Sequence, residues 1–296
     1  MSLSFAKHKK IYFAFSGILI SASAFCLFFF GLEPGIDFVG GSIMEVQYSE
    51  SRPSIDEVKS ALSEIDLGQL TVQTAEDNRH IIRMKDVSED IHQEALEKLS
   101  LVSSFEELRF ESVGPLVGKE LKNKTSLMAG LAIFGILIYI TLAFRGISKK
   151  PLPSWEYGLA SLIALGHDIV IPLGLFAYLG HFYGAQISIP VVTALLTVLG
   201  YSINNTVVVF DRVRENLIKD RRSSFEETVN NSINQSFSRS MNTSLTTLLV
   251  LFAVFFFGGE TLRYFSLALI VGLTAGTYSS LLLAPLMLVS WMRKKY

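Results

Sequence analysis

The stretch "GYSINNTVVVFDRVREN", residues 200–216, begins like a membrane helix and ends like a charged aqueous surface. Its apolar part contains a cluster of polar residues, which are Ser202, Asn204, Asn205 and Thr206. Ser202 and Asn205 are three residues apart and share a helix face with Arg212. Polar side chains at membrane depth usually face other protein or a water-filled cavity. The stretch therefore predicts one helix of a multi-helix membrane bundle.

The whole composition agrees with a membrane protein. Half of the 296 residues are hydrophobic and 22 are Phe. A helix needs about 17 to 25 apolar residues to cross the hydrocarbon core, and six stretches are long enough. They are residues 11–31, 125–144, 156–179, 188–210, 241–257 and 264–291. The first follows "KHKK" but continues beyond a typical signal peptide, so we interpret it as an uncleaved anchor in the lipid bilayer.

The positions of Lys and Arg predict the orientation. Short cytoplasmic loops carry an excess of these residues. With the N-terminus in the cytoplasm, Arg263 alone falls in the short outer loops. The cytoplasmic set is Lys7, Lys9, Lys10, Arg145, Lys149, Lys150, Arg212, Arg214, Lys219, Arg221, Arg222, Arg239, Arg293, Lys294 and Lys295. We therefore expect both termini inside and residues 32–124 outside, with residues 1–31 and 125–296 forming the membrane part.

Residues 32–124 show the pattern of a small α+β domain. Local periodicity reads strand, helix, strand, strand, helix, strand, with a hairpin turn at 76–78. Ser54 and Glu57 form a capping-box signature for the first helix. The apolar positions at helical spacing are Val58, Leu62 and Ile65 in the first helix and Ile91, Ala95, Leu96 and Leu99 in the second. This order is typical of a ferredoxin-like domain.

Several chemistries do not fit the sequence. "GIDFVGGS", residues 35–42, lacks the Lys-Ser/Thr of a P-loop and the spacing of a dinucleotide fingerprint. We interpret Gly35, Asp37, Gly40 and Gly41 as a structural or interface motif at the entry to the first strand. The five His residues form no metal-binding pattern, Cys26 is the single cysteine, and there is no GxSxG elbow. We expect no enzyme activity, no metal, no cofactor and no nucleic-acid partner.

Asp168, in "ALGHDIVIP", lies near the middle of the third apolar stretch. Desolvation disfavours an ionised carboxylate, so a group at such a depth can exchange a proton near neutral pH. Alternatively, neighbouring hydroxyls or His167 bond to the carboxylate and hold helices together. Pro172, four residues on, lacks a backbone N–H and frees a carbonyl near this site. Both interpretations remain open.

The face that carries Ser202 and Asn205 also has two interpretations. It can serve interhelical hydrogen bonding, or it can line a wet path for protons or ions. Asp211 and Arg212, at the cytoplasmic end of the same helix, are interpreted as an interface motif. In the last stretch, Gly272 and Gly276 form a small-xxx-small pattern that favours close helix packing.

Residues 223–240 predict an amphipathic helix. Ser224 and Glu227 form a second capping box, and the apolar positions recur every four residues. These positions are Phe225, Val229, Ile233 and Phe237. We expect this helix to lie at the cytoplasmic membrane interface and to bring Arg239 to the mouth of the fifth span. The default interpretation of Arg239 is a positive-inside anchor.

Five motifs in order resemble the SecF proteins of the SecD/SecF family. They are "GIDFVGGS", "HDIVIP", "GYSINNTVVVFDRVREN", "NNSINQSFSRSMNTSLTTLL" and "GTYSSLLLAP". The resemblance covers essentially the whole chain, with six spans and one extracytoplasmic domain. It implies an accessory subunit in the bacterial inner membrane that works with SecD and the SecYEG channel. Its role there would be to promote translocation of an unfolded polypeptide at the expense of the proton-motive force.

The family's proton-relay acid lies in "SINDT", and the matching position here is Asn205. The family's partner arginine is present as Arg239. An amide cannot bind and release a proton near neutral pH. We therefore expect the main acid to come from SecD, with Asn205 and Arg239 shaping the polar path and Asp168 as a secondary candidate. Two rivals remain open, which are a proton-coupled exporter of small molecules or lipids related to the resistance-nodulation-division transporters, and a scaffold that transports nothing.

Overall fold

A computed structural model describes residues 4–75, 77–143, 153–219 and 222–295. The chain divides into two compact units. The helical unit comprises Met1–Glu33, Met128–Ala185 and Ile189–Tyr296, and the sheet unit comprises Pro34–Leu127 and Gln186–Ser188. Of the residues used to predict orientation, Arg145, Lys149, Lys150 and Arg221 lie outside the described residues, as does Glu76 of the expected hairpin turn.

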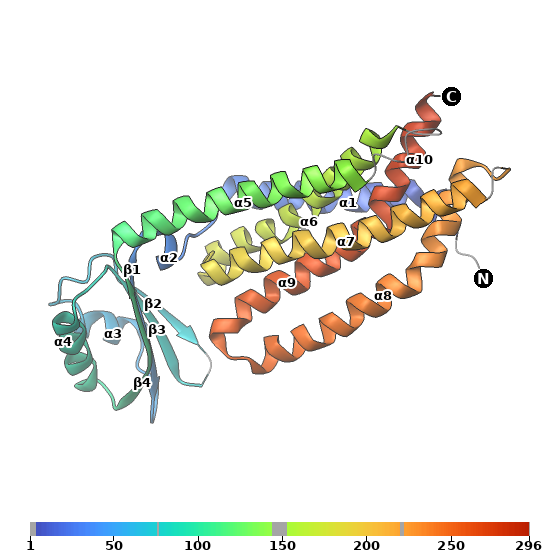
Figure 1. Cartoon of the computed structure of the whole chain (residues 1–296). Helices are drawn as coiled ribbons and strands as arrows, with labels where there is room; N and C mark the ends of the chain where they lie inside the picture. The colour runs from blue at the N-terminus through green and yellow to red at the C-terminus, as the bar shows by residue number, and fades with distance from the viewer. Residues whose placement is uncertain (1–3, 76, 144–152, 220–221, 296) are drawn as a thin grey trace. The chain divides into compact units, whose positions relative to one another are not determined.

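The sheet unit has the predicted order of elements. It runs through β1 Gly41–Tyr48, α3 Ile55–Ala61, β2 Thr71–Ala75, β3 Arg79–Met84, α4 Glu89–Ser100 and β4 Phe105–Val113. The strands are arranged β2-β3-β1-β4, and all paired neighbours are antiparallel. Figure 1 shows α3 and α4 on one face of this sheet. The α+β ferredoxin-like fold expected from the sequence is confirmed.

The core of the sheet unit lies between the sheet and its two helices. Because side chains alternate along a strand, every second residue of β1 and β3 faces α3 and α4. The buried members include Met44, Val46 and Tyr48 on β1, Ile82 and Met84 on β3, Val58 and Leu62 near α3, and Ala95 and Leu99 on α4. Ser54 caps α3 with both bonds of the capping box to Glu57. The helical periodicity in the sequence thus identified the inward positions.

The glycine motif enters β1 through a short helix, α2 Ile36–Val39. Gly40 has a φ of 79°, and a Cβ there would lie 2.7 Å from Pro115 Cα. Gly41 has a φ of 133°, and its Cβ would lie 2.8 Å from the Met84 carbonyl oxygen. Only glycine adopts such angles without strain and leaves room for another backbone this close. The Gly35 amide donates to the Ile187 carbonyl at 2.8 Å, so the 186–188 loop joins the same unit.

Six helical segments are long and apolar enough to cross a membrane, counted within the described residues. The helical unit begins with a 3-10 turn, Phe5–His8, and α1 Lys9–Phe29. Next come α5 Pro115–Ala143, which enters this unit at Met128, and then α6 Ser154–Tyr183, α7 Ile189–Lys219 and α8 Phe225–Phe257. The last span consists of α9 Glu260–Tyr278, a π-turn Ser279–Leu283 and α10 Ala284–Lys295. The expected polytopic helical fold is confirmed.

The helix α8 differs from the sequence expectation. We expected a separate interfacial helix at 223–240, but residues 225–257 form one continuous helix that contains neither Gly nor Pro. Phe225, Val229 and Ile233 are buried among residues of α7 and the N-terminal 3-10 turn instead of being left for lipid. Phe237 stacks on Phe5 at 5.8 Å between ring centroids. The apolar face of this segment therefore belongs to the protein core.

Candidate functional site

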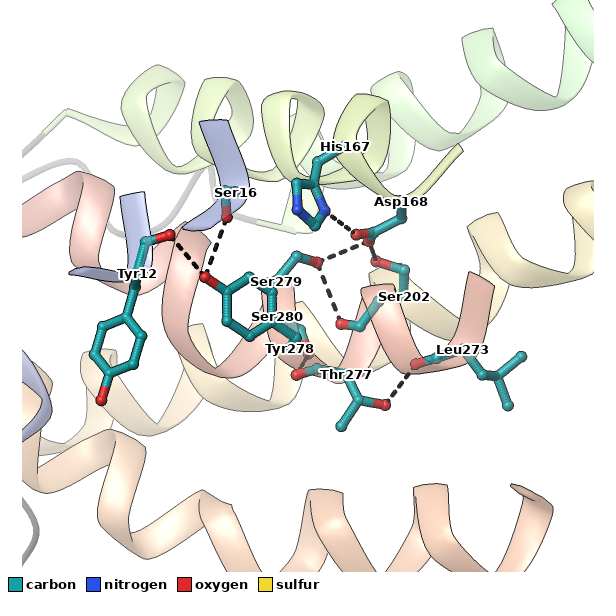
Figure 2. Close-up of polar contacts among 11 residues, drawn as sticks. Tyr12, Ser16, His167, Asp168, Ser202, Leu273, Thr277, Tyr278, Ser279 and Ser280 are labelled. Carbon is teal, nitrogen blue, oxygen red and sulfur yellow. Dashed lines mark hydrogen bonds and ion pairs between the residues drawn. The ribbon is translucent and has the colours of Figure 1, made fainter. Parts of the chain in front are cut away.

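Asp168 is the central residue of a fully buried polar cluster, which we call the Asp168 cluster: His167, Asp168, Ser202 and Ser279. The ring Nδ1 of His167 lies 2.9 Å from Asp168 Oδ1. Ser279 Oγ donates to Asp168 Oδ2 at 2.8 Å, and Ser202 Oγ donates to the same oxygen. Figure 2 shows these side chains converging from α6, α7 and the π-turn. Both carboxylate oxygens are thus satisfied by the protein.

Local backbone features hold this cluster in place. The π-turn begins at Ser279, directly after Tyr278 at the end of α9. A π-turn changes the direction of the side chains that follow it, and such turns are frequent at functional sites. On α6, Pro172 has no N–H to donate to the carbonyl four residues earlier, which is that of Asp168 itself. The carbonyl freed by Pro172 therefore belongs to the acid, as the sequence suggested in outline.

His167 has one ring nitrogen that the protein leaves unsatisfied. Its Nε2 is buried and has no hydrogen-bond partner among the described residues. The ring lies beside that of Tyr278, with centroids 5.9 Å apart. Most buried polar atoms in native proteins have a partner. The vacant nitrogen is therefore a feature that requires an explanation.

Tyr278 connects the neighbourhood of this cluster to α1. Its hydroxyl donates to the Tyr12 carbonyl at 2.8 Å and accepts from Ser16 Oγ at 3.1 Å. Figure 2 shows this pair of bonds beside His167. Because Ser279 directly follows Tyr278, neighbouring residues bind α1 and the Asp168 carboxylate.

Asn205 lies one turn from Ser202 on α7 and is 4% exposed. Its Nδ2 is buried without a hydrogen-bond partner in the part of the chain that the structure describes. Arg239, on α8, is exposed, and no described contact links it to Asn205 or to Asp168. The structure therefore assembles a polar site around Asp168, whereas the two residues that match the family relay remain apart within this chain.

The other predicted positions have separate environments. Asp211 is exposed, and Arg212 forms an ion pair with Glu215 at 2.6 Å. A second hydroxyl cluster joins three helices: Tyr201 donates to Ser244 Oγ at 3.2 Å, and Ser244 and Thr277 share a hydrogen bond of 2.6 Å. The search of the described residues found no group of His, Cys, Asp and Glu suited to a metal ion.

Sequence reasoning missed Ser279 and Tyr278. Both lie in "GTYSSLLLAP", which was interpreted as a packing surface. The available signal was a pair of adjacent serines in an apolar span. Hydroxyls in an apolar span tend to hydrogen-bond across helices, and Asp168 was an acid already placed in another span.

Comparisons with known proteins agree over the whole chain. The family described as "Protein export membrane protein SecD/SecF, C-terminal" matches residues 92–295, and the "SecD/SecF GG Motif" matches residues 27–51. The chain belongs to the SecD/SecF family. A "Protein translocase subunit SecF" from Thermobaculum terrenum is 38% identical over 99% of this chain and 95% of its own length. The subunit of the same name from Anaerolinea thermophila is 37% identical over 96% of this chain and 92% of its own.

Solved structures of this family are also similar. The crystal structure of SecDF from Thermus thermophilus, described as a translocon-associated membrane protein, matches 99% of this chain with a TM-score of 0.86 and 32% identity. A structure of SecDF in a super-membrane-facing form matches with a TM-score of 0.70. This chain spans 39% of the length of either structure. The resemblance read from the five motifs is confirmed.

Proposed function

We propose that this chain, together with SecD and the SecYEG channel, uses the proton-motive force to promote the export of unfolded polypeptides. The accessory role in Sec protein export is that of its SecF relatives, which it matches over nearly their whole length. The use of protons, the channel and the cargo are our proposal. Each proton that crosses 100 mV releases about 2.3 kcal/mol, which is enough to bias a conformational step.

A stripe of exposed polar residues on α8 carries this proposal. Arg239, Asn242 and Thr246 recur at helical spacing and are all exposed in the isolated chain. Asn204 is likewise exposed on α7, which packs against α8. Lipid solvates an arginine or an amide poorly, so we propose that these residues face a partner helix. A single positive charge favours a partner that carries a carboxylate.

SecD is the partner that fits this surface best. Asn205 cannot titrate, so this chain lacks the acid of the family relay at the matching position. A carboxylate on a SecD helix would supply both the acid and the counter-charge for Arg239. In this arrangement Asn205 and Arg239 shape the polar path and do not themselves carry the proton. No bond-making chemistry is needed, and we expect no enzymatic activity.

The proposed orientation follows the distribution of positive charge. Both termini lie in the cytoplasm and the sheet unit lies on the outer side of the bacterial inner membrane. Protons entering from the outer side would then move toward the Arg-rich cytoplasmic ends of α7 and α8. The sheet unit would then carry out the part of export that takes place on the outer side.

Depletion of this chain in cells tests the function. Unprocessed secretory precursors should accumulate, and the defect should grow when the membrane potential is dissipated only partly. Normal precursor processing combined with sensitivity to drugs or altered lipids would favour the small-molecule exporter instead. Loss of SecD from membranes without any change in potential dependence would favour the scaffold.

A substitution at Asn205 tests whether SecD, and not this chain, supplies the relay acid. Asn205→Asp restores an acid at the family position. When the membrane acid of SecD is replaced by its amide, we expect Asn205→Asp to recover part of the potential-dependent export. If SecD without that acid supports normal export beside the unaltered chain, the proposed source of the acid is wrong.

A further inference from the structure

We propose that His167 and Asp168 together bind one exchangeable proton inside this chain, with His167 Nε2 as the atom at which the proton enters and leaves. This inference rests on the proposed function and adds a second proton site to the one shared with SecD. Asp168 is fully buried on α6, within the apolar span Trp155–Tyr183. Its carboxylate is separate from the Asn205 position, which has no hydrogen bond to it.

The hydrogen bonds define where a proton can be held. An ionised carboxylate only accepts, so His167 Nδ1 donates to Oδ1 while Ser202 and Ser279 donate to Oδ2. A neutral imidazole that donates from Nδ1 has its lone pair on Nε2. That atom is buried and has no partner among the described residues. It is therefore the vacant acceptor of the cluster.

The net charge of the His167–Asp168 pair explains why the unpaired Nε2 favours binding a proton. With neutral His167 the pair carries one net negative charge in the interior of a membrane bundle. A proton on Nε2 produces an imidazolium beside the carboxylate and makes the pair neutral, which lowers the cost of burial. The same proton can instead lie on the carboxyl group and face Nδ1. The two hydrogen-bonded residues therefore hold the proton together.

The neighbouring helices add no competing charge. Among the residues that the structure describes, no other charged group forms an ion pair with His167 or Asp168. The π-turn and α7 present the hydroxyls of Ser279 and Ser202. A titratable side chain beside the cluster is that of Tyr278 on α9, whose hydroxyl donates to the Tyr12 carbonyl of α1.

Tyr278 is the positioning residue that transmits the change of protonation. When the proton lies on the carboxyl group, the bond from Ser279 to Asp168 is no longer charge-assisted and weakens. Ser279 follows Tyr278 directly, and the Tyr278 hydroxyl holds α1 through Tyr12 and Ser16. Along the chain, α1 leads directly into the first residues of the sheet unit. Proton binding is thereby linked to α1, the helix that precedes the sheet unit in the chain.

Infrared difference spectroscopy of the full chain in complex with SecD, in lipid, tests the proposal. A step in pH should produce carboxyl and imidazole bands that Asp168→Asn abolishes. His167→Gln keeps an amide donor but cannot be protonated, so it should remove the imidazole bands and leave the carboxyl band. Identical spectra for the unaltered and Asp168→Asn proteins would overturn the proposal.

Matched variants separate a proton site from a structural link. Ser279→Ala removes one donor to Oδ2 and should move the carboxyl band, because the carboxyl group loses a hydrogen bond. Ser161→Ala removes a buried serine that bonds only to the Tyr157 carbonyl of its own helix, and the spectrum should not change. If Asp168→Asn does not fold, the Ser279→Ala variant decides, and a carboxyl band that does not move refutes the proposal.

Export measurements distinguish this proposal from the function on which it rests. Asp168→Asn should lose the potential-dependent part of precursor export and keep SecD in the complex. If Asp168→Asn exports as well as the unaltered chain, the second proton site is wrong and the accessory function stands. If cells without the chain export normally at every membrane potential, the proposed function itself fails.

Discussion

Gly276 of α9 lies directly against Asp168 of α6. A Cβ at Gly276 would lie 3.4 Å from Asp168 Oδ2 and 3.1 Å from the Ser202 Cβ. The glycine therefore provides the space in which the carboxylate meets its two hydroxyl donors. This gives the small-xxx-small pattern of the last span a role in the polar cluster as well as in helix packing.

Gly276→Ala should weaken the bundle by about 1–3 kcal/mol, because the added methyl group overpacks the cluster. The matched control is Gly200→Ala on α7, where an added Cβ meets nothing within 4 Å. That variant should be more stable by about 0.5–1 kcal/mol, since alanine favours a helix over glycine. Equilibrium unfolding in detergent measures both values, and equal stabilities for the two variants would contradict the packing argument.

Ile233→Ala tests the burial of the first half of α8. Ile233 is fully buried, so its truncation should cost about 2–5 kcal/mol in unfolding free energy. Asn231, two residues earlier, is exposed, and Asn231→Ala should change stability by less than about 0.5 kcal/mol. If the first half of α8 lay on lipid, Ile233→Ala would change the unfolding free energy little. It would instead weaken the binding of this segment to anionic vesicles.

His80 makes the stability of the sheet unit depend on pH. Burial, and secondarily the charge of Arg52, lowers the pKa of His80 below its ordinary value of 6.5. Neither ring nitrogen has a partner among the described residues, and the Tyr48 ring packs against it. The unfolded chain therefore binds the proton more readily. Stability is complete above about pH 6.5 and falls as the pH drops below that value toward the folded pKa.

Hydrogen exchange of the β3 amides in the full chain measures this dependence. Protection should decrease from about pH 7.5 to about pH 5 after correction for intrinsic exchange. His80→Leu removes the titrating group and should flatten the profile. A flat profile in the unaltered protein would show that His80 is protonated equally in both states.

Arg239→Gln should weaken association with SecD at least about tenfold, equivalent to about 1.4 kcal/mol, because a partner carboxylate loses its counter-charge. Lys219→Gln is the control, since Lys219 is exposed and pairs with Glu215 of its own helix. Copurification from native membranes at graded detergent measures the difference. Equal retention of SecD by both variants would remove Arg239 from the interface.

The local sequence pattern was sufficient to predict much of the fold. Long apolar runs predict membrane helices because the bilayer imposes a length, and strand alternation with the Ser54 cap predicted the sheet unit. The extent of α8 was not predictable in this way. The same amphipathic face at Phe225, Val229 and Ile233 can meet lipid or protein, and only tertiary packing decides which.

The candidate site was predictable only in part. The sequence identified Asp168 as an unusual buried acid, and it also named His167 as a possible partner. Ser202 and Ser279 lie 34 and 111 residues away from Asp168, so their convergence depends on the packing of three helical segments. The π-turn that begins at Ser279 has no clear local signature. The relay match at Asn205 and Arg239 came from resemblance, and no contact found in the described parts of the chain joins the two residues.

The unbroken length of α8 has a mechanical consequence. Its 33 residues extend about 50 Å, and the hydrocarbon core accounts for about 30 Å of that. Because α8 contains no glycine or proline at which it could bend, it would move as one rigid body. A tilt of about 5° at its Phe257 end would move its Phe225 end by about 4 Å. Phe237, on which Phe5 stacks, would move by about 2.6 Å. Small angular changes within the membrane would therefore be amplified at the opposite end of the helix.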